Sequence, residues 1–239
     1  MLFVWYKVSF DEKWSHGSAV CETVYFFVEF VCVFPWKCVS LNNQNRGKIM
    51  DGILRKLPIG IQTFEKLREG DYLYVDKTAL VWRIASTETP YFLSRPRRFG
   101  KSLLLSTFEA YFEGKKELFE GLAIADMEKE WKTYPLFHLD LNAEKYDSPQ
   151  ALVEILSRQL TQWELKYGKG EDEETLSGRF AGVIRRACEQ SGRGVVVLVD
   201  EYDKPLLQAL GDDALLDDYR KTLKAFYLSL IHISEPTRH

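Results

Sequence analysis

The chain has 239 residues, 46% of them hydrophobic and 28% charged, which suits one α/β domain with an extension. Its formal net charge of -3 excludes a global electrostatic attraction to nucleic acid. None of the cysteines stands in a CxxC pair, which excludes the usual zinc spacing and a disulfide framework. Cys188 has apolar neighbours on an amphipathic segment, so it is expected to be a buried thiol.

The first 49 residues differ in character from the rest of the chain. The most apolar run, Thr23–Val39, is interrupted by Glu29 and Pro35, and it is shorter than the ~20 apolar residues of a membrane span. It also lacks the pattern of a signal peptide, so no membrane role is expected. We interpret residues 1–49 as upstream sequence translated by mistake, the alternative being a genuine apolar extension. A peptide from this segment in the native protein, detected by mass spectrometry, would contradict that interpretation.

Strand and helix patterns alternate from there on. The sequence predicts short strands over 72–75, 90–94, 136–141 and 194–199, and helices over 101–113, 151–167, 175–190 and 215–227. Ser148 and Pro149 open the second helix, and Gly114 ends the first. The uninterrupted run at 194–199 is typical of a strand buried on both faces. This order predicts an α/β fold with three α/β/α layers around a mostly parallel sheet.

A phosphate-binding pattern follows the strand predicted at 90–94. The general form G-x-x-x-x-G-K-[ST] is met here by Arg95, Pro96, Arg97, Arg98, Phe99, Gly100, Lys101 and Ser102. Gly100 lets the backbone approach a phosphate, Lys101 reaches the β- and γ-phosphates, and Ser102 is placed to ligate Mg²⁺. Because Arg95 replaces the first glycine, the match is incomplete. From the loop alone, the alternative that the GKS sequence stands at a helix start by coincidence stays open.

A second pattern supports the first. The apolar strand Val195–Val199 ends in Asp200 and Glu201. At the carboxyl end of a buried strand, Asp200 can hold Mg²⁺ and Glu201 can act as the base that polarises an attacking water. A catalytic Glu beside this Asp favours an ATPase over a GTPase. The predicted ligands are therefore ATP and Mg²⁺, with Glu201 and Lys101 catalytic and with Ser102 and Asp200 at the metal.

Three segments follow one another along the chain: YVDKT at 74–78, SRPRRFGKS at 94–102 and DEYDKP at 200–205. Together they resemble the AAA-ATPase-like family of uncharacterised bacterial P-loop proteins, and the resemblance covers about 57–227. The resemblance implies a cytoplasmic P-loop NTPase in which an Arg in place of the first glycine is usual. Tyr74, Asp76 and Lys77 belong to its first segment and lie either near the nucleotide or in a structural turn.

Other candidates carry less weight. Asp140, Asp203 and Lys204 fit the family pattern without an assigned role. His138 alternates with apolar neighbours on a predicted strand, so it is expected to be structural. The basic residues within Tyr219–Lys224 are expected to form a solvated helix face rather than a nucleic-acid patch.

The end of the chain is expected to be foreign. Residues 228–238 read LSLIHISEPTR, which resembles a translated sequencing adapter, so 50–227 is taken as an incomplete P-loop domain and 228–239 as the tail. The resemblance implies a further strand between the phosphate-loop strand and the Asp200 strand, and a C-terminal nuclease-like domain through which nucleic acid would be a partner. Without that strand the centre of the sheet would be unfilled and the chain poorly folded in isolation.

These observations predict an Mg-dependent ATP-binding protein that hydrolyses ATP in support of an unknown, nuclease-linked activity. Two alternatives stay open at this stage: a regulatory module that binds nucleotide without hydrolysis, and an interaction scaffold with a vestigial loop. The sequence does not predict an oligomeric state.

Overall fold

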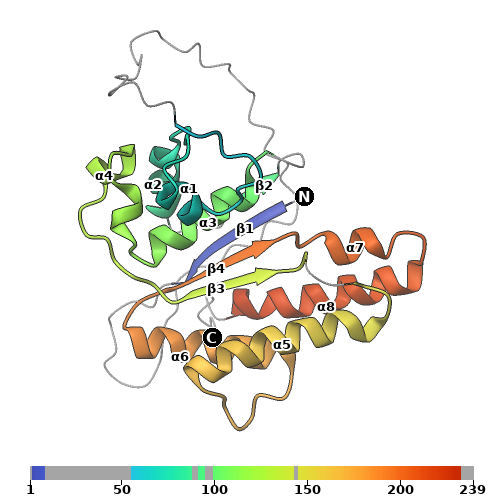
Figure 1. The fold of residues 1–239 in the computed structure, drawn as a ribbon. Coiled ribbons are helices and arrows are strands. Elements are labelled where there is room, and N and C mark those ends of the chain that lie inside the picture. The colour runs from blue at the N-terminus through green and yellow to red at the C-terminus, as the bar shows by residue number, and fades with distance from the viewer. Residues whose placement is uncertain (1, 9–54, 88–90, 95–98, 143–144, 233–239) are drawn as a thin grey trace.

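A four-stranded sheet organises the molecule. The computed structural model describes residues 2–8, 55–87, 91–94, 99–142 and 145–232. The strands are β1 (Leu2–Val8), β2 (Tyr91–Ser94), β3 (Leu136–Asp140) and β4 (Val195–Asp200), in the spatial order β2-β1-β4-β3. Figure 1 shows the sheet between two groups of helices. The mixed α/β class predicted from the sequence is therefore confirmed.

The direction of β1 distinguishes this sheet from the expected one. β1 runs antiparallel to both β2 and β4, whereas β3 and β4 are parallel, with Leu136 opposite Val196 and Asp140 opposite Asp200. It follows that β2, β4 and β3 share one direction and that β1 alone opposes it. The expectation of an unfilled sheet centre was wrong, because β1 fills it. For the same reason, only one of the three neighbouring strand pairs is parallel.

The helices on one face pack against the side of β4 that carries Val196 and Leu198. They are α1 (Phe64–Glu69), α2 (Thr78–Ala85), α3 (Lys101–Phe112), the 3₁₀ turn η1 (Lys116–Phe119) and α4 (Ala123–Met127). Their core is rich in aromatic rings, with Phe64, Phe108, Phe112 and Phe119 fully buried. This layer carries the phosphate-loop helix α3.

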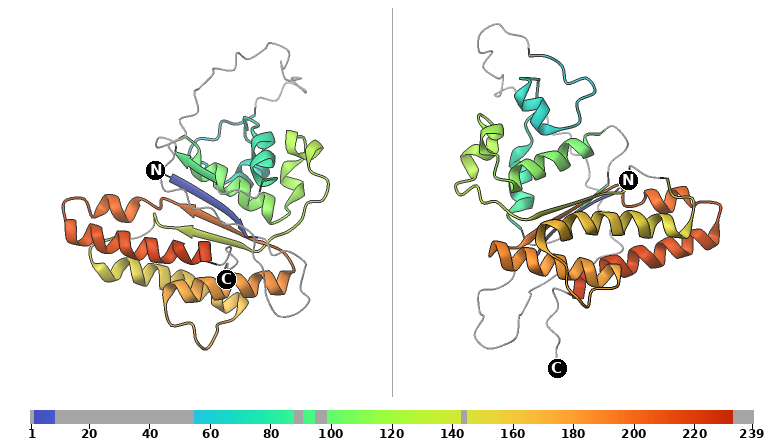
Figure 2. Two further views of the ribbon diagram at one scale, coloured as in Figure 1. Left: turned by 180° about the vertical axis from the view of Figure 1, so that it is seen from behind. Right: turned by 60° about the horizontal axis from the view of Figure 1, so that its bottom comes forward.

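The opposite face is covered by longer helices. They are α5 (Pro149–Tyr167), α6 (Leu176–Ser191) and α8 (Asp213–His232), with the short α7 (Lys204–Gln208) at the edge. A stack of rings joins β3 to these helices, from Phe137 through Trp163 and Phe180 to Phe226, with centroids 4.7, 5.6 and 4.4 Å apart in turn. Both views of Figure 2 show helices on each side of the sheet, which gives three layers.

Most predicted elements are present within a residue or two of the expected bounds. β4 is buried along its whole length, and the hydroxyl of Thr175 caps α6 by accepting from the N–H of Gly178. Residues 72–75 do not form the predicted strand, because only Tyr72 bridges, to Lys56, and Leu73 and Val75 remain exposed. α8 continues past the predicted end at 227 as far as His232.

Two expectations drawn from the composition, on Cys188 and on membrane spans, can be compared with the structure. Cys188 is buried, as predicted. Among the residues that the structure describes, no helix is long and apolar enough to cross a membrane. The apolar run at 23–39 and the other three cysteines lie outside the described residues.

An ion pair fastens the loop between α5 and α6. The guanidinium of Arg186 donates to both carboxylate oxygens of Glu173, at 2.5 and 3.0 Å, and Gly170 N–H donates to the same group. The Arg186 hydrogen bond holds the pKa of Glu173 below its ordinary value. The carboxylate lies against Gly182, where an added Cβ would meet it at 1.6 Å. The glycine thus makes room for the ion pair.

We expect this pair to make the fold acid-sensitive. Because the folded-state pKa of Glu173 is depressed, its contribution to stability is present above the unfolded-state pKa, about 4.3, and is lost as pH falls through the folded value. Glu173→Gln should therefore lower the melting temperature near neutral pH but show a smaller further loss between about pH 6 and pH 3 than wild type. Thermal unfolding across that range measures both. Parallel pH curves for the two proteins would contradict the prediction.

Candidate active site

The N-terminus of α3 presents the first half of the candidate site. Gly100 adopts a left-handed conformation (φ 72°) directly before the helix, a geometry that favours glycine, and an added Cβ there would meet nothing within 4 Å. No described residue therefore crowds the space beside Gly100. Lys101 is 7% exposed and Ser102 is exposed at the first turn. Arg95, Pro96, Arg97 and Arg98 lie outside the described residues, and Phe99 is exposed.

The carboxyl ends of β3 and β4 form the second half. Asp140 and Asp200 are opposite each other in the parallel register. Since side chains alternate along a strand, Asp200 lies on the same face as Val196 and Leu198, which is the face covered by α3. The chain is bonded across this edge, with Leu141 N–H donating to the Asp200 carbonyl at 3.1 Å. The register thus brings two acidic side chains toward the phosphate-loop helix.

Glu201 follows Asp200 in a strained backbone conformation. It is 7% exposed and has φ 54°, in the left-handed region that non-glycine residues seldom occupy. Its carbonyl accepts a hydrogen bond from the N–H of Lys204, which closes the turn after β4. Strain of this kind concentrates at functional sites and is maintained by the surrounding structure.

Asp200 and Glu201 both have a carboxyl group whose pKa lies above its ordinary value. Burial raises the pKa of Asp200, and Asp140 raises it further, while His138 and Lys101 act in the opposite direction. Burial also raises the pKa of Glu201, with Asp200 adding to the effect and Lys101 opposing it. Lys101 is therefore close enough to act electrostatically on both carboxyl groups.

The same carboxyl groups suit a magnesium ion. Mg²⁺ is usually held by one or two carboxylates together with phosphate oxygens and water, so a cage built only of protein ligands is not needed. In the described part of the chain no cluster of three or more potential metal-binding side chains is found. The pair predicted from the sequence, Ser102 and Asp200, is of the kind that fits an ion shared with a phosphate, since Asp200 lies buried and opposed to a second carboxylate.

His138 connects the two halves, which sequence reasoning did not foresee. Its Nδ1 lies 2.7 Å from Oε1 of Glu109 on α3. Burial alone would lower the pKa of His138, but the Glu109 hydrogen bond and the charges of Glu109, Asp140 and Asp200 raise it. His138 thus ties the phosphate-loop helix to β3, which agrees with the predicted structural role. The detectable signal was its position two residues before Asp140, on the same face of the strand.

Lys204 spans the two strand ends. Its Nζ donates to the carbonyl and the side-chain oxygen of Asn142, at 3.1 and 2.6 Å. Asn142 N–H in turn donates to the carboxylate of Asp140 at 2.8 Å. A chain of contacts therefore runs from the turn after β4 to the end of β3. It gives Lys204 and Asp140, which had no assigned role, a part in shaping the carboxyl edge.

The segment containing Tyr74, Asp76 and Lys77 forms a structural turn. One oxygen of Asp76 accepts from the N–H and hydroxyl of Thr78, and the other accepts from Ala123 N–H at 2.7 Å. The buried Thr78 hydroxyl accepts from Ile124 N–H at 3.1 Å. Asp76 and Thr78 therefore join the start of α2 to the start of α4. Of the two readings left open by the sequence, these contacts favour the structural one.

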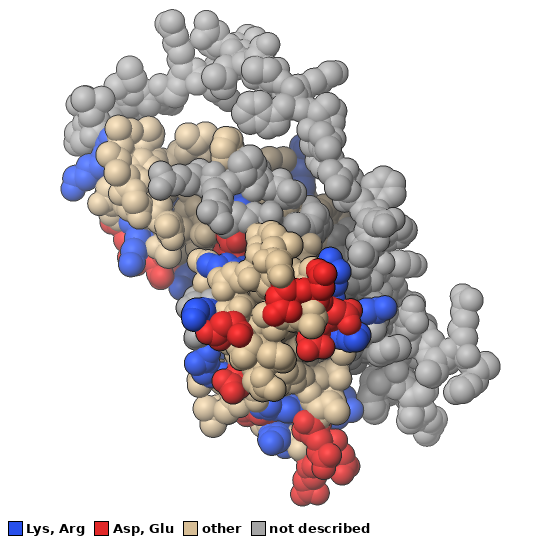
Figure 3. Space-filling view, turned by 90° about the vertical axis from the view of Figure 1, so that its right-hand side faces the viewer, with Lys and Arg blue, Asp and Glu red and all other residues tan. Residues whose placement is uncertain are grey.

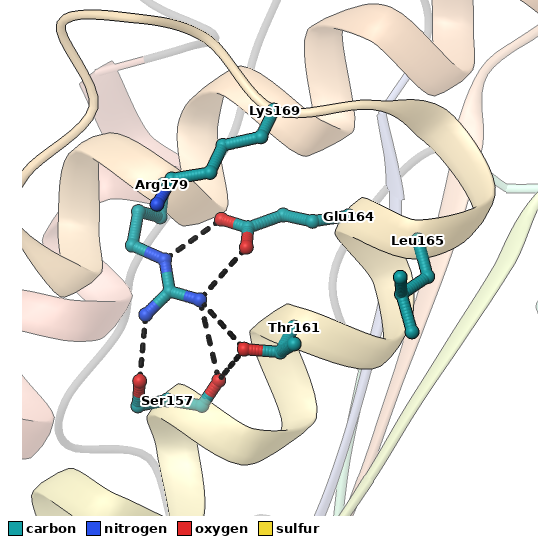
Figure 4. A pocket seen from close by; sticks show the side chains of 6 residues that line it. All are labelled: Ser157, Thr161, Glu164, Leu165, Lys169 and Arg179. Atoms are coloured by element: carbon teal, nitrogen blue, oxygen red, sulfur yellow. Dashed lines mark hydrogen bonds and ion pairs between the residues drawn. The ribbon is translucent and has the colours of Figure 1, made fainter.

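A shallow hollow between α5 and α6 lies on the other face of the sheet. Arg179 fills its centre and donates to both carboxylate oxygens of Glu164, at 2.7 and 2.8 Å (Figure 4). The same guanidinium reaches the hydroxyls of Ser157 and Thr161. Because the polar groups in this hollow bond to one another, we assign it a structural role and place the candidate site at the carboxyl edge.

The molecular surface beside that edge carries mixed charge. Figure 3 views the molecule from the side toward which β3 and β4 point, and acidic and basic side chains are interspersed there over the described residues. Arg220, Lys221 and Lys224 are exposed on α8, and Lys221 pairs with Asp217 one turn earlier. This agrees with the solvated helix face predicted from the sequence.

Helices on both faces of the sheet, an open glycine turn at a helix start and a buried Asp-Glu pair at a neighbouring strand end define an α/β protein with a site suited to phosphate. Residues 58–237 match the family described as "Predicted AAA-ATPase", and the chain belongs to that family. The family indicates ATP binding through a P-loop. The matched residues include β2, β3 and β4 but not β1.

One curated relative extends the comparison. It is the "Uncharacterized protein in vnfD 5'region" of Azotobacter chroococcum mcd 1, 41% identical over 174 residues. The match covers 72% of this chain but 34% of the relative, so the chain spans about a third of that protein's length. No solved structure matches.

Proposed function

We propose that this chain binds Mg-ATP at the carboxyl edge of the sheet and hydrolyses it, slowly or on stimulation by a partner. The observation that carries the proposal is that buried Lys101, at the start of α3, lies within electrostatic reach of the buried Asp200 and Glu201 at the end of β4. A helix start supplies N–H groups and a positive field for phosphate, and the strand end supplies carboxylates for a metal and a base.

Each residue takes a role that its position allows. Lys101 and the N–H groups of the first turn of α3 bind the terminal phosphates, and Ser102 and Asp200 would hold Mg²⁺. The metal, when bound, neutralises charge that builds up on the phosphates. Glu201 accepts a proton from the attacking water, a role that needs its carboxylate form. Its raised pKa brings it nearer to the pH at which it operates.

We propose that ATP turnover serves a part of the protein that lies outside the described fold. The chain spans about a third of its curated relative, so most of a protein of that length lies outside the matched region. The resemblance of the motifs to longer family members supports coupling to a nuclease-like domain in a cytoplasmic bacterial protein, with nucleic acid as the partner of that domain. Nuclease assays on a full-length relative, with and without ATP, test the coupling, and ATP-independent cleavage would contradict it.

Replacing Lys101 tests the nucleotide site itself. Lys101→Ala removes a charged donor, and a hydrogen bond to a charged group is worth about 1.5–3 kcal/mol, so Mg-ATP affinity should fall at least tenfold. Isothermal titration calorimetry measures the change, and a thermal melt checks that the variant is folded. The matched control is Lys116→Ala, an exposed lysine in η1, which should bind as wild type does. Unchanged affinity in folded Lys101→Ala would refute the site.

A further inference from the structure

β1 occupies the position in the sheet that determines how far apart the two halves of the site lie. On one side it pairs with β2, which leads into the phosphate loop, with Val4 opposite Phe92. On the other side it pairs with β4, which ends in Asp200, with Val4 opposite Val199. Each pairing spans about 4.8 Å, so β1 holds β2 and β4 roughly 10 Å apart.

β1 does not belong to the unit that carries the motifs. The family match begins at residue 58, and the three strands inside it share one direction, which β1 opposes. Without β1, β2 and β4 would each expose a row of unpaired backbone groups to the same gap. The matched residues of this chain therefore present a slot one strand wide, which β1 fills in the direction opposite to theirs.

The site is assembled while β1 occupies the slot. Lys101 is buried, and it acts on the carboxyl groups of both Asp200 and Glu201, in the structure that contains β1. A strand that obstructed the site would keep these groups apart. We propose that Leu2–Val8 is a spacer strand, which sets the separation of the phosphate loop and the carboxylate strand, and on which nucleotide binding depends. This inference rests on the proposed function.

A disulfide that locks β1 in place tests whether the spacer is compatible with binding. Directly opposed residues of antiparallel strands have Cβ atoms about 4.5–5.5 Å apart, within reach of a disulfide after a small adjustment. In the full chain, Val4→Cys with Val199→Cys should cross-link on oxidation, and peptide mapping by mass spectrometry identifies the bond. Oxidised and reduced forms should bind Mg-ATP within threefold of each other. The control is Val4→Cys with Val195→Cys, which should not cross-link, because Val195 lies opposite Val8.

A proline tests whether the spacer is needed. Tyr6 lies opposite Val197, and Tyr6→Pro removes a backbone donor and disrupts the centre of the ladder. Mg-ATP affinity should fall at least tenfold, and hydrogen exchange should rise at least tenfold at the β4 amides that face β1, Val197 among them, but not at Val196, whose N–H bonds to Pro135. The matched variant Tyr6→Val keeps the donor and should change neither.

The outcomes separate the spacer from the nucleotide site. Absence of the Val4–Val199 cross-link, or an affinity loss above threefold on oxidation, would overturn the spacer proposal, as would unchanged exchange or unchanged Mg-ATP affinity in Tyr6→Pro. If Tyr6→Pro fails to fold, the cross-linked protein still tests whether nucleotide binding is compatible with a fixed β1. If no form of the protein, wild type included, binds Mg-ATP, the proposed function fails, while the cross-link and the exchange at β4 continue to report on β1.

Discussion

Glu201→Gln is expected to abolish ATP turnover while Mg-ATP binding persists. The amide keeps the size of the side chain but cannot accept a proton from water, and a general base contributes about 10²- to 10⁴-fold to a rate. The hydrolysis rate should therefore fall by at least about 100-fold. Phosphate release under saturating Mg-ATP measures the rate, and calorimetry measures the affinity. The matched control, Glu189→Gln, alters an exposed glutamate of α6 and should leave both unchanged.

The pH dependence of the wild-type ATP hydrolysis rate provides a second test of the role of Glu201. Burial and the charge of Asp200 raise the pKa of Glu201, so the base is protonated over a wider range than an ordinary glutamate. The rate should rise with pH until Glu201 is ionised and then level off. A Glu201→Gln enzyme that turns over at the wild-type rate would contradict the assignment and favour a switch that binds nucleotide without hydrolysing it.

A large loss of folding stability is expected far from the candidate site, at the ion pair between α5 and α6. Arg179 and Glu164 have side chains only 11% and 6% exposed. Removal of one partner from a buried pair leaves an uncompensated charge and costs about 3–5 kcal/mol. Glu164→Leu should therefore lower the free energy of unfolding by an amount of that order, although the contacts of Arg179 with Ser157 and Thr161 reduce the loss. Urea unfolding followed by circular dichroism measures it.

The double variant sharpens this prediction. Glu164→Leu with Arg179→Met removes both charges, and apolar replacements of buried pairs are often neutral or stabilising, so stability should return to near the wild-type value. The control pair, Lys221 and Asp217, is exposed on α8, and Lys221→Ala should cost less than about 1 kcal/mol. A double variant as unstable as Glu164→Leu alone would show that the loss comes from packing rather than from the stranded charge.

Local sequence signals located most of the helices and the buried strands. Ser148 and Pro149 marked the start of α5, the helix expected over 175–190 corresponds to α6, and the apolar run of β4 implied burial on both faces. These signals succeed because capping and burial depend on neighbouring residues. The prediction at 72–75 failed because β propensity needs a partner strand, and the described structure supplies Tyr72 with a single bridge.

The site was predictable where its parts are contiguous and unpredictable where they are assembled by the fold. Asp200 and Glu201 follow a strand directly, and Lys101 follows Gly100, so their places at a strand end and a helix start could be read in order, while their roles stay predictions. The position of His138 on a strand, two residues before Asp140, could be read from the sequence, but its contact with Glu109 on a helix could not. β1 was missed for the same reason, because its pairing with β2 and β4 depends on contacts remote in sequence.

The left-handed backbone at Glu201 has a consequence for engineering. A glutamate there stores conformational energy of about 1–3 kcal/mol, which glycine or asparagine would release. A screen for heat-resistant variants should therefore favour Gly or Asn at this position, and each would remove the base assigned to hydrolysis. A substitution of Glu201 by Gly or Asn should therefore raise thermostability and lower ATP turnover together. A consensus-based redesign of the domain needs to keep this glutamate.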